Sequence, residues 1–439
     1  MHFPRYFLAL TLWPTAAAAQ GLEVSGTVRL RYETIANQPR AGFNRDDALV
    51  NLRTTLLAKY DSGPVIFVAE VWDSRVYGGD GGTPVTTGES NALEMVQAYV
   101  ARELSPGAGT RATIRGGRFT LNIGSRRLVA ADDYRNTTNG YTGLNAEILA
   151  AGDVTANLIY VLPQQRRPDD PASLRRNAIA LDREGFGLVL WGGTVAKNRA
   201  IGPLLLETSF YHLGERDTPR RPTRNRSLDT YGGRLLRDSS PGKLDVEIEA
   251  YYQSGTISAS IAPNAARLPV SAWFVHGEAG YTFAAGWKPR LSVEYDRASG
   301  DRPGNRYGRF DTLFGMRRAD LAPAGLYNAV GRSNISTGGV RVEVAPSKRL
   351  DGFVSYHALW LAERRDSFST TAIRDGMGRS GNFAGHQFDA RLRWWIRPAA
   401  LRLEADAVLL SKGRFLEVAP NAPSGRKTRY ASLNLTANF

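Results

Sequence analysis

The stretch that decides the fold is the last ten residues, 430–439, which read YASLNLTANF. Side chains of a β-strand point alternately to its two faces, so this segment has one apolar face and one polar face. An apolar face that ends in an aromatic residue is typical of the closing strand of an outer-membrane β-barrel, where one face meets lipid and the other a wet lumen. The edge of a soluble sheet alternates in a similar way, so the rest of the chain has to decide. The apolar face comprises Ala431, Leu433, Leu435, Ala437 and Phe439.

The amino-terminal end has the pattern of a secretory signal peptide. Arg5 precedes an apolar run over residues 6–12, and Ala17 and Ala19 fit an A-x-A cleavage pattern. The alternative is a membrane anchor, but the apolar run is too short to span a bilayer. We therefore expect residues 1–19 to be a signal peptide. A secreted chain that ends in a strand is either a periplasmic β-protein or an outer-membrane barrel.

Composition narrows this choice. The 439 residues contain no cysteine, which excludes a disulfide framework and thiolate chemistry. The 45 glycines and 18 tyrosines suit the tight turns and aromatic girdles of a membrane barrel. The 56 basic and 42 acidic residues give a net charge of +14, which indicates anionic partners such as a polysaccharide, lipopolysaccharide or nucleic acid. The secretory signal argues against nucleic acid.

Alternating segments recur along the whole chain without a linker between them. We therefore expect residues 21–439 to form one all-β domain, a transmembrane antiparallel β-barrel of about 18 strands in the bacterial outer membrane. An even strand count places both termini in the periplasm, and a barrel of this size leaves an aqueous channel. The expected strands are 23–35, 46–60, 64–73, 93–104, 110–118, 142–151, 153–162, 184–196, 201–213, 228–238, 243–254, 272–284, 288–298, 335–345, 349–362, 384–396, 399–411 and 427–439.

The connections support this topology, because short periplasmic turns alternate with longer outer loops in such barrels. No segment is left over for a separate plug domain. Two of the long loops, 119–141 and 299–334, have the length to fold inward as gates, although nothing in the sequence says that they do. The short turns fall near 61–63, 105–109, 239–242, 285–287, 346–348 and 397–398, and the long loops at 74–92, 119–141, 163–183, 214–227, 299–334, 363–383 and 412–426.

The polar faces of the strands are highly charged. In the segment 384–396, Asp389, Arg391 and Arg393 share one face, and Phe388 and Leu392 share the other. A charge on every second residue is hard to place in a dry sandwich core, because an unpaired buried charge is costly. It is natural in a water-filled lumen, so the sequence favours the barrel.

Three stretches resemble the alginate-export family of outer-membrane barrels. Residues 117–137 contain GRF, GSRRLV and YRNT, similar to the family's Gly-Arg-Gln, Gly…Arg-Leu and Trp-x-Asn-Thr pattern. Phe119 stands where glutamine is usual, and Tyr134 stands where tryptophan is usual. Residues 298–314 contain ASGD and FDTLF, which resemble the loop after the family's thirteenth strand, and residues 385–439 follow the family's ending.

This resemblance covers nearly the whole mature chain. It implies a monomeric 18-stranded channel with an electropositive constriction that passes an anionic polyuronate. Because members of the family are not all alginate exporters, a diffusion porin for small anionic solutes is the alternative function. Periplasmic export components and outer-membrane lipid, including lipopolysaccharide, are the expected partners besides the polysaccharide.

Alternation assigns a set of arginines to the lumen. A polyuronate carries a carboxylate on each sugar, and the planar guanidinium binds a carboxylate in bidentate fashion and stays charged. Arg391 and Arg393 are the strongest candidates, together with Arg118 from the family motif, although alternation from Ile114 would turn Arg118 outward unless a bulge intervenes. The predicted pore-lining residues are Arg29, Arg31, Arg53, Arg115, Arg118, Arg341, Arg391, Arg393 and Arg402, with the acids Asp389, Glu404 and Asp406.

The same strands carry further inward acids, so each arginine has a second interpretation as one half of a structural ion pair between neighbouring strands. These acids are Glu33, Glu247, Glu249, Glu278, Glu294 and Glu343.

An enzyme is the third functional class, and the sequence argues against it. No G-x-S-x-G or H-E-x-x-H motif is present. His276, beside Glu278, points inward by alternation, which does not suit the outward Ser–His pair of barrel phospholipases. Two lumenal carboxylates could hydrolyse a glycosidic bond, but acids that line a pore more commonly set selectivity. We therefore expect a passive channel that needs no metal or other cofactor.

Overall fold

The computed structural model describes residues 21–439 except 108, 133, 219–220 and 317–320. The expected signal peptide therefore lies outside the described residues. The strands are β1 (Gly21–Ala36), β2 (Asp47–Asp61), β3 (Ile66–Tyr77), β4 (Asn91–Gly107), β5 (Thr110–Phe119), β6 (Tyr141–Ala150), β7 (Val154–Pro163), β8 (Leu188–Ile201), β9 (Leu204–Glu215), β10 (Ser227–Arg237), β11 (Lys243–Ser258), β12 (Arg267–Thr282), β13 (Arg290–Ala298), β14 (Ile335–Ser347), β15 (Leu350–Trp360), β16 (Phe383–Arg397), β17 (Leu401–Lys412) and β18 (Lys427–Asn438).

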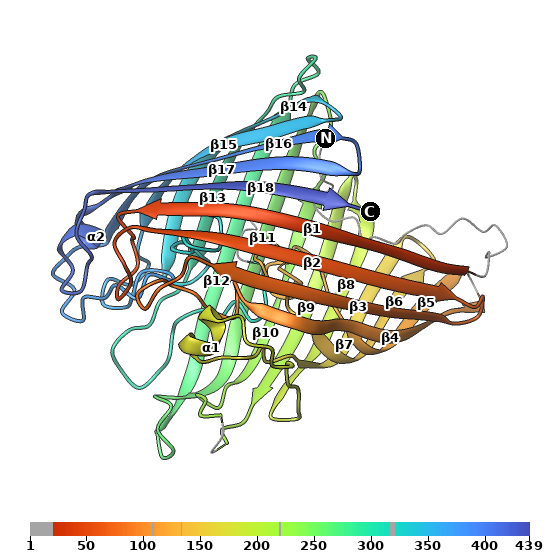
Figure 1. The fold of residues 1–439 in the computed structure, drawn as a ribbon, viewed down its shortest axis with the longest axis horizontal. Helices are drawn as coiled ribbons and strands as arrows, with labels where there is room; N and C mark the ends of the chain where they lie inside the picture. The colour runs from red at the N-terminus through yellow and green to blue at the C-terminus, as the bar shows by residue number, and fades with distance from the viewer. Residues whose placement is uncertain (1–20, 108, 133, 219–220, 317–320) are drawn as a thin grey trace.

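These 18 strands form one closed antiparallel barrel, as the sequence predicts (Figure 1). Each strand pairs with its neighbours in the sequence, and β1 pairs with β18, with Arg29 opposite Thr436 and Glu33 opposite Ser432. Closure leaves no unpaired sheet edge, which a membrane requires because lipid cannot hydrogen-bond to exposed backbone groups.

The alternation that defines the closing strand is visible in the burial of β18. Leu433 and Leu435 are exposed on the outside of the barrel, whereas Ser432 and Asn434 are buried on the inside. The same period governs β1, where Leu30 is exposed between the buried Arg29 and Arg31. The outer face is therefore apolar, for contact with lipid, and the inner face is polar.

The terminal aromatic residue takes part in closing the barrel. The backbone N–H of Phe439 donates to the carbonyl of Gly26 at 3.0 Å, and the N–H of Gly26 donates to the carbonyl of Phe439 at 2.8 Å. The ring of Phe439 lies where a β-carbon on Gly26 would be, so only glycine leaves room for it. The last residue is thus fixed on the first strand.

Several expected strand boundaries differ from the structure by a few residues, for example those around β8. The strand expected at 184–196 begins later, at Leu188, because Gly185 accepts a hydrogen bond from the Leu188 N–H and so forms a turn. It continues to Ile201, and the next strand begins at Leu204 rather than 201. Residue Gly202, at φ +58°, makes the tight turn between them.

Helical structure is confined to two short segments in the long loops, α1 (Pro171–Arg175) and α2 (Arg414–Val418). Asp170 caps α1, because its side chain accepts a hydrogen bond from the Ser173 N–H at 2.9 Å. Among the described residues, no helix is long and apolar enough to span a membrane.

Two of the long loops fold into the barrel. We call residues 120–140 the β5–β6 loop and residues 299–334 the β13–β14 loop. Their apolar residues belong to the hydrophobic core together with inward side chains of the wall, as Val129 and Tyr327, both fully buried, illustrate. A β-bridge joins the two loops at Val129 and Phe314, and the Phe314 N–H donates to the Leu128 carbonyl at 3.0 Å. The core of this protein therefore lies inside the barrel, between the loops and the wall.

Candidate functional site

Seven of the predicted arginines lie on the inward face of adjacent strands, from β14 through β18 to β2. We call them the arginine wall. Their positions follow from the alternation: Arg391 lies between the exposed Leu392 and the outward Ala390, and the other members have similarly outward neighbours. Register places Arg29 directly opposite Arg53. The members are Arg29, Arg31, Arg53, Arg341, Arg391, Arg393 and Arg402.

Three members of the arginine wall hold the β5–β6 loop. Arg29 donates to the carbonyls of Tyr134 at 3.2 Å and Arg135 at 2.6 Å. Arg31 donates to the Tyr134 carbonyl at 2.6 Å, and its guanidinium lies 4.4 Å from the Tyr134 ring centre. Arg53 donates to the Arg135 carbonyl at 3.2 Å. Three guanidinium groups therefore donate hydrogen bonds to the main-chain carbonyls of one loop segment, residues 134–135.

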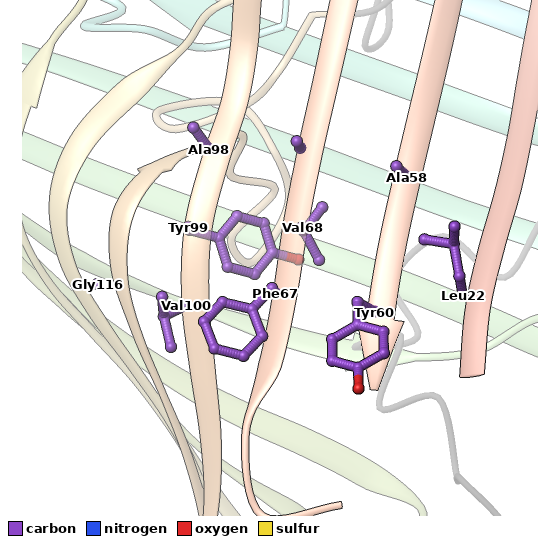
Figure 2. Close-up of a pocket in the computed structure, with 10 residues that line it drawn as sticks. Leu22, Ala58, Tyr60, Phe67, Val68, Ala98, Tyr99, Val100 and Gly116 are labelled. Carbon is purple, nitrogen blue, oxygen red and sulfur yellow. The ribbon is translucent and has the colours of Figure 1, made fainter. Parts of the chain in front are cut away.

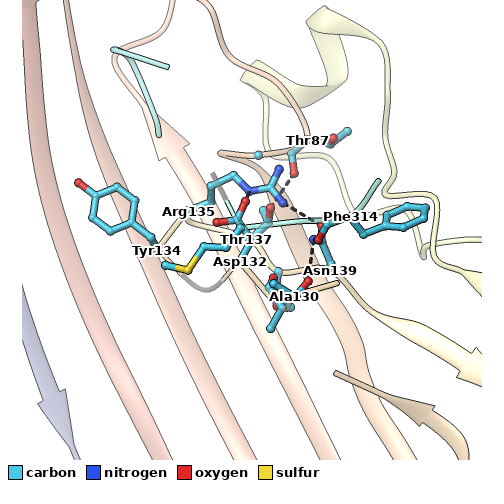
Figure 3. Close-up of polar contacts among 12 residues, drawn as sticks. Thr87, Ala130, Asp132, Tyr134, Arg135, Thr137, Asn139 and Phe314 are labelled. Carbon is cyan, nitrogen blue, oxygen red and sulfur yellow. Dashed lines mark hydrogen bonds and ion pairs between the residues drawn. The ribbon is translucent and has the colours of Figure 1, made fainter. Parts of the chain in front are cut away.

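The segment is also braced within the loop (Figure 3). Arg135 forms an ion pair of 2.8 Å with Asp132 and donates to Asn139 Oδ1, also at 2.8 Å. The Thr137 hydroxyl donates to the carbonyl of Thr87 in the β3–β4 loop at 2.7 Å. These contacts fix the carbonyls that face the arginine wall.

Two further arginines stack on one aromatic ring. The guanidinium of Arg341 lies 3.8 Å from the centre of the Phe353 ring, and that of Arg391 lies 5.0 Å from it. Phe353 stands opposite Arg391 on the neighbouring strand, so the ring is held between the two charges by the register. Stacking on an aromatic face orients a guanidinium while leaving its charge in place.

The remaining members have acidic neighbours. Arg393 pairs with Asp351 across the strands, with Nη2 2.6 Å from the carboxylate, and Arg402 lies 3.9 Å from Glu404. Asp406 accepts from the Tyr134 hydroxyl at 3.2 Å, and Asp389 is buried on the same inward face. For Arg393 the interpretation as a structural ion pair therefore fits the geometry.

Two predicted arginines lie away from this wall. Arg115 is inward on β5 and pairs with Glu147 at 3.0 Å. Arg118 stands opposite Ala98, which is outward, so it shares the outer face with Ile114 and no bulge turns it inward. The prediction that Arg118 lines the pore does not fit this register.

Arg118 instead anchors an outer loop. Its guanidinium forms ion pairs with Glu94 at 2.6 Å and with Glu184 at 2.7 Å, which joins the loop between β7 and β8 to the strand ends. In the same loop the Asp182 N–H donates to Glu94 at 2.7 Å. Burial, with a smaller contribution from the Glu94 carboxylate, raises the pKa of Asp182 to about 7.

The inward faces of β9 to β15 carry acids and histidines, in a sector that adjoins the arginine wall at Arg341. We call this group the acid–histidine cluster. Arg127 of the β5–β6 loop reaches it and pairs with Glu247 at 2.7 Å and with Glu249. The sequence alone gave Arg127 no role, and the only signal was its place in a family-like motif. The cluster comprises Glu207, Asp245, Glu247, Glu249, Glu278, Glu294, Asp296, Glu343, His276, His357 and the arginines Arg127, Arg234, Arg290 and Arg341.

The β13–β14 loop is fixed to the strands that carry the arginine wall. The Leu326 N–H donates to the Glu33 carboxylate at 3.0 Å, and the Tyr327 hydroxyl donates to Gln387 Oε1 at 2.6 Å. Gln387 in turn donates to the Leu321 carbonyl at 2.6 Å. Both loops that the sequence marked as long enough to be gates therefore fold inward, and together they cross the lumen.

A shallow apolar pocket of about 400 Å³ lies on the lipid-facing surface among the first five strands (Figure 2). The rings of Tyr60 and Phe67, 6.3 Å apart, stand beside small residues such as Ala58, Ala98 and Gly116. Aromatic rings near a strand end are typical of the interfacial girdle of a membrane barrel.

Comparisons with known proteins agree with this architecture. A family model described as alginate export matches residues 20–429. The Pseudomonas aeruginosa porin OccK8 (OprE) has the same fold, with a TM-score of 0.60 and 13% identity over 95% of this chain and 98% of that one. Pseudomonas aeruginosa OpdQ gives 0.59 and 11%, over 95% and 97%. Pseudomonas aeruginosa OccK2 (OpdF), solved in complex with glucuronate, gives 0.57 and 12%, over 97% and 99%. No curated protein sequence matches the chain.

Proposed function

The chain belongs to the alginate-export family, and we propose that it passes an anionic polysaccharide such as alginate, or its oligomers, along the arginine wall. The family and the porin-like fold make the protein an outer-membrane channel rather than an enzyme. Passage is passive, so a concentration gradient or a periplasmic export partner supplies the driving force.

The observation that supports the proposal is the concentration of inward arginines on one side of the lumen. The arginine wall occupies strands from β14 to β2, where it also has acidic neighbours such as Asp351 and Glu404, whereas the acids of the acid–histidine cluster lie mainly on β11 to β13. A carboxylate on each sugar is attracted to a row of guanidinium groups and repelled by a carboxylate surface. Several adjacent sites of moderate strength allow a polymer to advance without being trapped at one of them.

A porin for small anionic solutes is the second candidate, and one observation favours it. The β5–β6 and β13–β14 loops are joined to each other and cross the lumen, which suits small solutes better than a polymer. OccK2, a protein with the same fold, was solved with glucuronate, a single uronate. Both candidates share a carboxylate cargo and differ in its length.

Single-channel recording with cargo of different length tests the proposal. Oligouronate added to one side should produce transient blocks that shorten as the voltage driving the anion increases, because passage then ends each block. A neutral oligosaccharide of equal length should give far fewer blocks. Blocks that lengthen steadily with voltage would mean that the oligomer enters but does not pass, and would favour the small-solute porin.

Variants then locate the pathway. In Arg391→Gln/Arg402→Gln, which removes two inward charges, we expect the frequency of oligouronate blocks to fall. Arg102→Gln is the matched control, because Arg102 is an exposed arginine on β4, opposite Ile114 on the outward face. An equal fall in both variants would contradict a role for the arginine wall.

A further inference from the structure

Deep in the acid–histidine cluster, three side chains have the arrangement of metal ligands. Glu247 of β11 lies opposite Glu278 of β12, and His276 lies two residues from Glu278 on the same face of its strand. One potential ligand atom from each of the three lies within 4.8 Å of the others. From this geometry we propose that Glu247, His276 and Glu278 bind one divalent metal ion of the zinc class.

The spacing suits one small ion. Two ligand atoms on a tetrahedral zinc ion are about 3.4 Å apart, given bonds of about 2.1 Å. The three side chains are therefore nearly in place and need only small rotations to close on the ion. Their residues are 2–3% exposed, which sets them apart from the exposed acidic groups that gather on surfaces without binding anything.

Asp296 orients the imidazole ring of His276 for binding to the metal ion. The Nδ1 of His276 lies 2.9 Å from Oδ1 of Asp296, so the carboxylate selects the tautomer that carries its proton on Nδ1. Nε2 is then the nitrogen with a lone pair. A carboxylate behind the imidazole is the usual support of a zinc-binding histidine, because it fixes the ring and makes it a stronger donor.

The buried charge of Asp296 favours a bound cation at this place. Asp296 is fully buried, and its Oδ2 accepts no hydrogen bond from the described residues. Across the described residues of the acid–histidine cluster, seven carboxylates are joined by ion pairs to four guanidinium groups, and Asp296, beside His276, adds an eighth carboxylate. Buried charge without compensation is costly. A divalent ion would supply two of the missing positive charges.

The neighbouring arginines approach one oxygen of each proposed carboxylate ligand. Arg127 and Arg234 approach Oε1 of Glu247, and Arg290 approaches Oε1 of Glu278. An ionised carboxylate has about four lone-pair positions, so it can accept a guanidinium and bind a metal at the same time. The donors are one imidazole nitrogen and carboxylate oxygens, a set that suits zinc better than calcium or magnesium. The chain has no cysteine to compete for it.

The other buried histidine provides a matched control. His357 lies 3.2 Å from Glu294 through Nε2 and is as deeply buried as His276. Its ring lies over Gly339, where a β-carbon would overlap it. His357 is therefore also buried and also contacts a carboxylate, but it is not one of the three proposed metal ligands.

The test is a metal count on the full barrel, purified without a histidine tag, stripped with a chelator and exposed to micromolar zinc. We expect about one zinc per chain after removal of free metal, and visible absorption bands of four-coordinate cobalt when Co²⁺ replaces it. His276→Asn should lower the affinity at least tenfold, and His357→Asn should leave it unchanged. Asp296→Asn, which keeps all three ligands, should weaken binding about 10- to 100-fold.

Two results would overturn the proposal. One is a folded wild-type barrel that retains no zinc, which would assign the missing charge to protonated groups. The other is an equal loss of zinc in His276→Asn and His357→Asn. Because the wild-type count and cobalt spectrum need no variant, the proposal is tested even if one substitution prevents folding. The result is independent of which cargo the channel passes.

Discussion

Arg29 and Arg53 stand directly opposite each other on β1 and β2, and both guanidinium groups donate to the same carbonyl oxygen, that of Arg135. Like charges at directly opposed positions destabilise a sheet. The Arg135 carbonyl and its neighbours offset this repulsion, so the β5–β6 loop and the arginine wall stabilise each other. A charge arrangement that needs such compensation is better explained by function than by stability.

Arg29 and Arg53 donate to different groups among the described residues of the β5–β6 loop, which predicts different effects on the loop. In that part of the loop, Arg29 donates to Tyr134, Arg135 and Asn136, whereas Arg53 donates to Arg135. Hydrogen bonds from a charged group contribute about 1.5–3 kcal/mol each. We therefore expect Arg29→Gln to loosen the β5–β6 loop more than Arg53→Gln does, which should appear as larger current fluctuations in single-channel records. Equal fluctuations in the two variants would contradict this account of the loop.

Phe353 should couple energetically to Arg391. Phe353→Leu keeps an apolar side chain but removes the aromatic face, and cation–π contacts contribute about 0.5–2 kcal/mol. A double-mutant cycle with Arg391→Met, measured by urea unfolding in lipid vesicles, should give a coupling energy in this range. Phe388→Leu is the control, because Phe388 is on the outer face of the same strand as Arg391. Coupling of similar size to Phe388 would exclude a specific stack.

Gly325 is one of the points at which the β13–β14 loop contacts the barrel wall. Its φ is +81°, and a β-carbon there would overlap the Glu33 carboxylate. Gly325→Ala should therefore displace the loop and increase single-channel conductance. Gly376→Ala, in the loop between β15 and β16, is the control, because open space surrounds that position. An unchanged conductance in Gly325→Ala would show that this loop does not limit the current.

The raised pKa of Asp182, about 7, predicts a pH-dependent outer loop. The folded protein holds this proton more tightly than an unfolded chain, whose aspartates have a pKa of about 3.9, so the contribution of Asp182 to stability falls as pH rises from about 4 to about 7. Hydrogen exchange in the loop 164–187, corrected for intrinsic rates, should accelerate over this range. Asp182→Asn should remove the dependence, and Asp169→Asn, at an exposed site in the same loop, should keep it. Equal protection of the wild-type loop at about pH 4 and about pH 7 would disprove the effect.

Much of the wall could be predicted from the sequence, because each strand carries its two faces in its own residues. The exposed Leu433 and the buried Ser432 follow from a period of two alone. The outward position of Arg118 follows from the same rule, and the family motif that favoured an inward position misled the prediction. The loops could not be placed this way, since Tyr134 and Leu326 belong to no periodic segment.

The way in which the residues of the acid–histidine cluster come together could not be predicted from the sequence either. Glu247, His276 and Glu278 were each predicted to point inward, but their proximity depends on which residues of β11 and β12 stand opposite each other. That register depends on the hairpin connection between Ser258 and Arg267, which the alternation within either strand does not define. Likewise, Arg127 comes from a loop, and its approach to Glu247 has no counterpart in a local pattern.

The central claim, that the arginine wall controls passage, is tested most directly by the zero-current potential of the purified channel in a planar bilayer under a tenfold KCl gradient. We predict a potential close to that of a chloride-selective pore, which moves toward zero in Arg391→Gln/Arg402→Gln and stays in place in Arg102→Gln. A potential of the opposite sign, or one that none of these variants changes, would contradict the account.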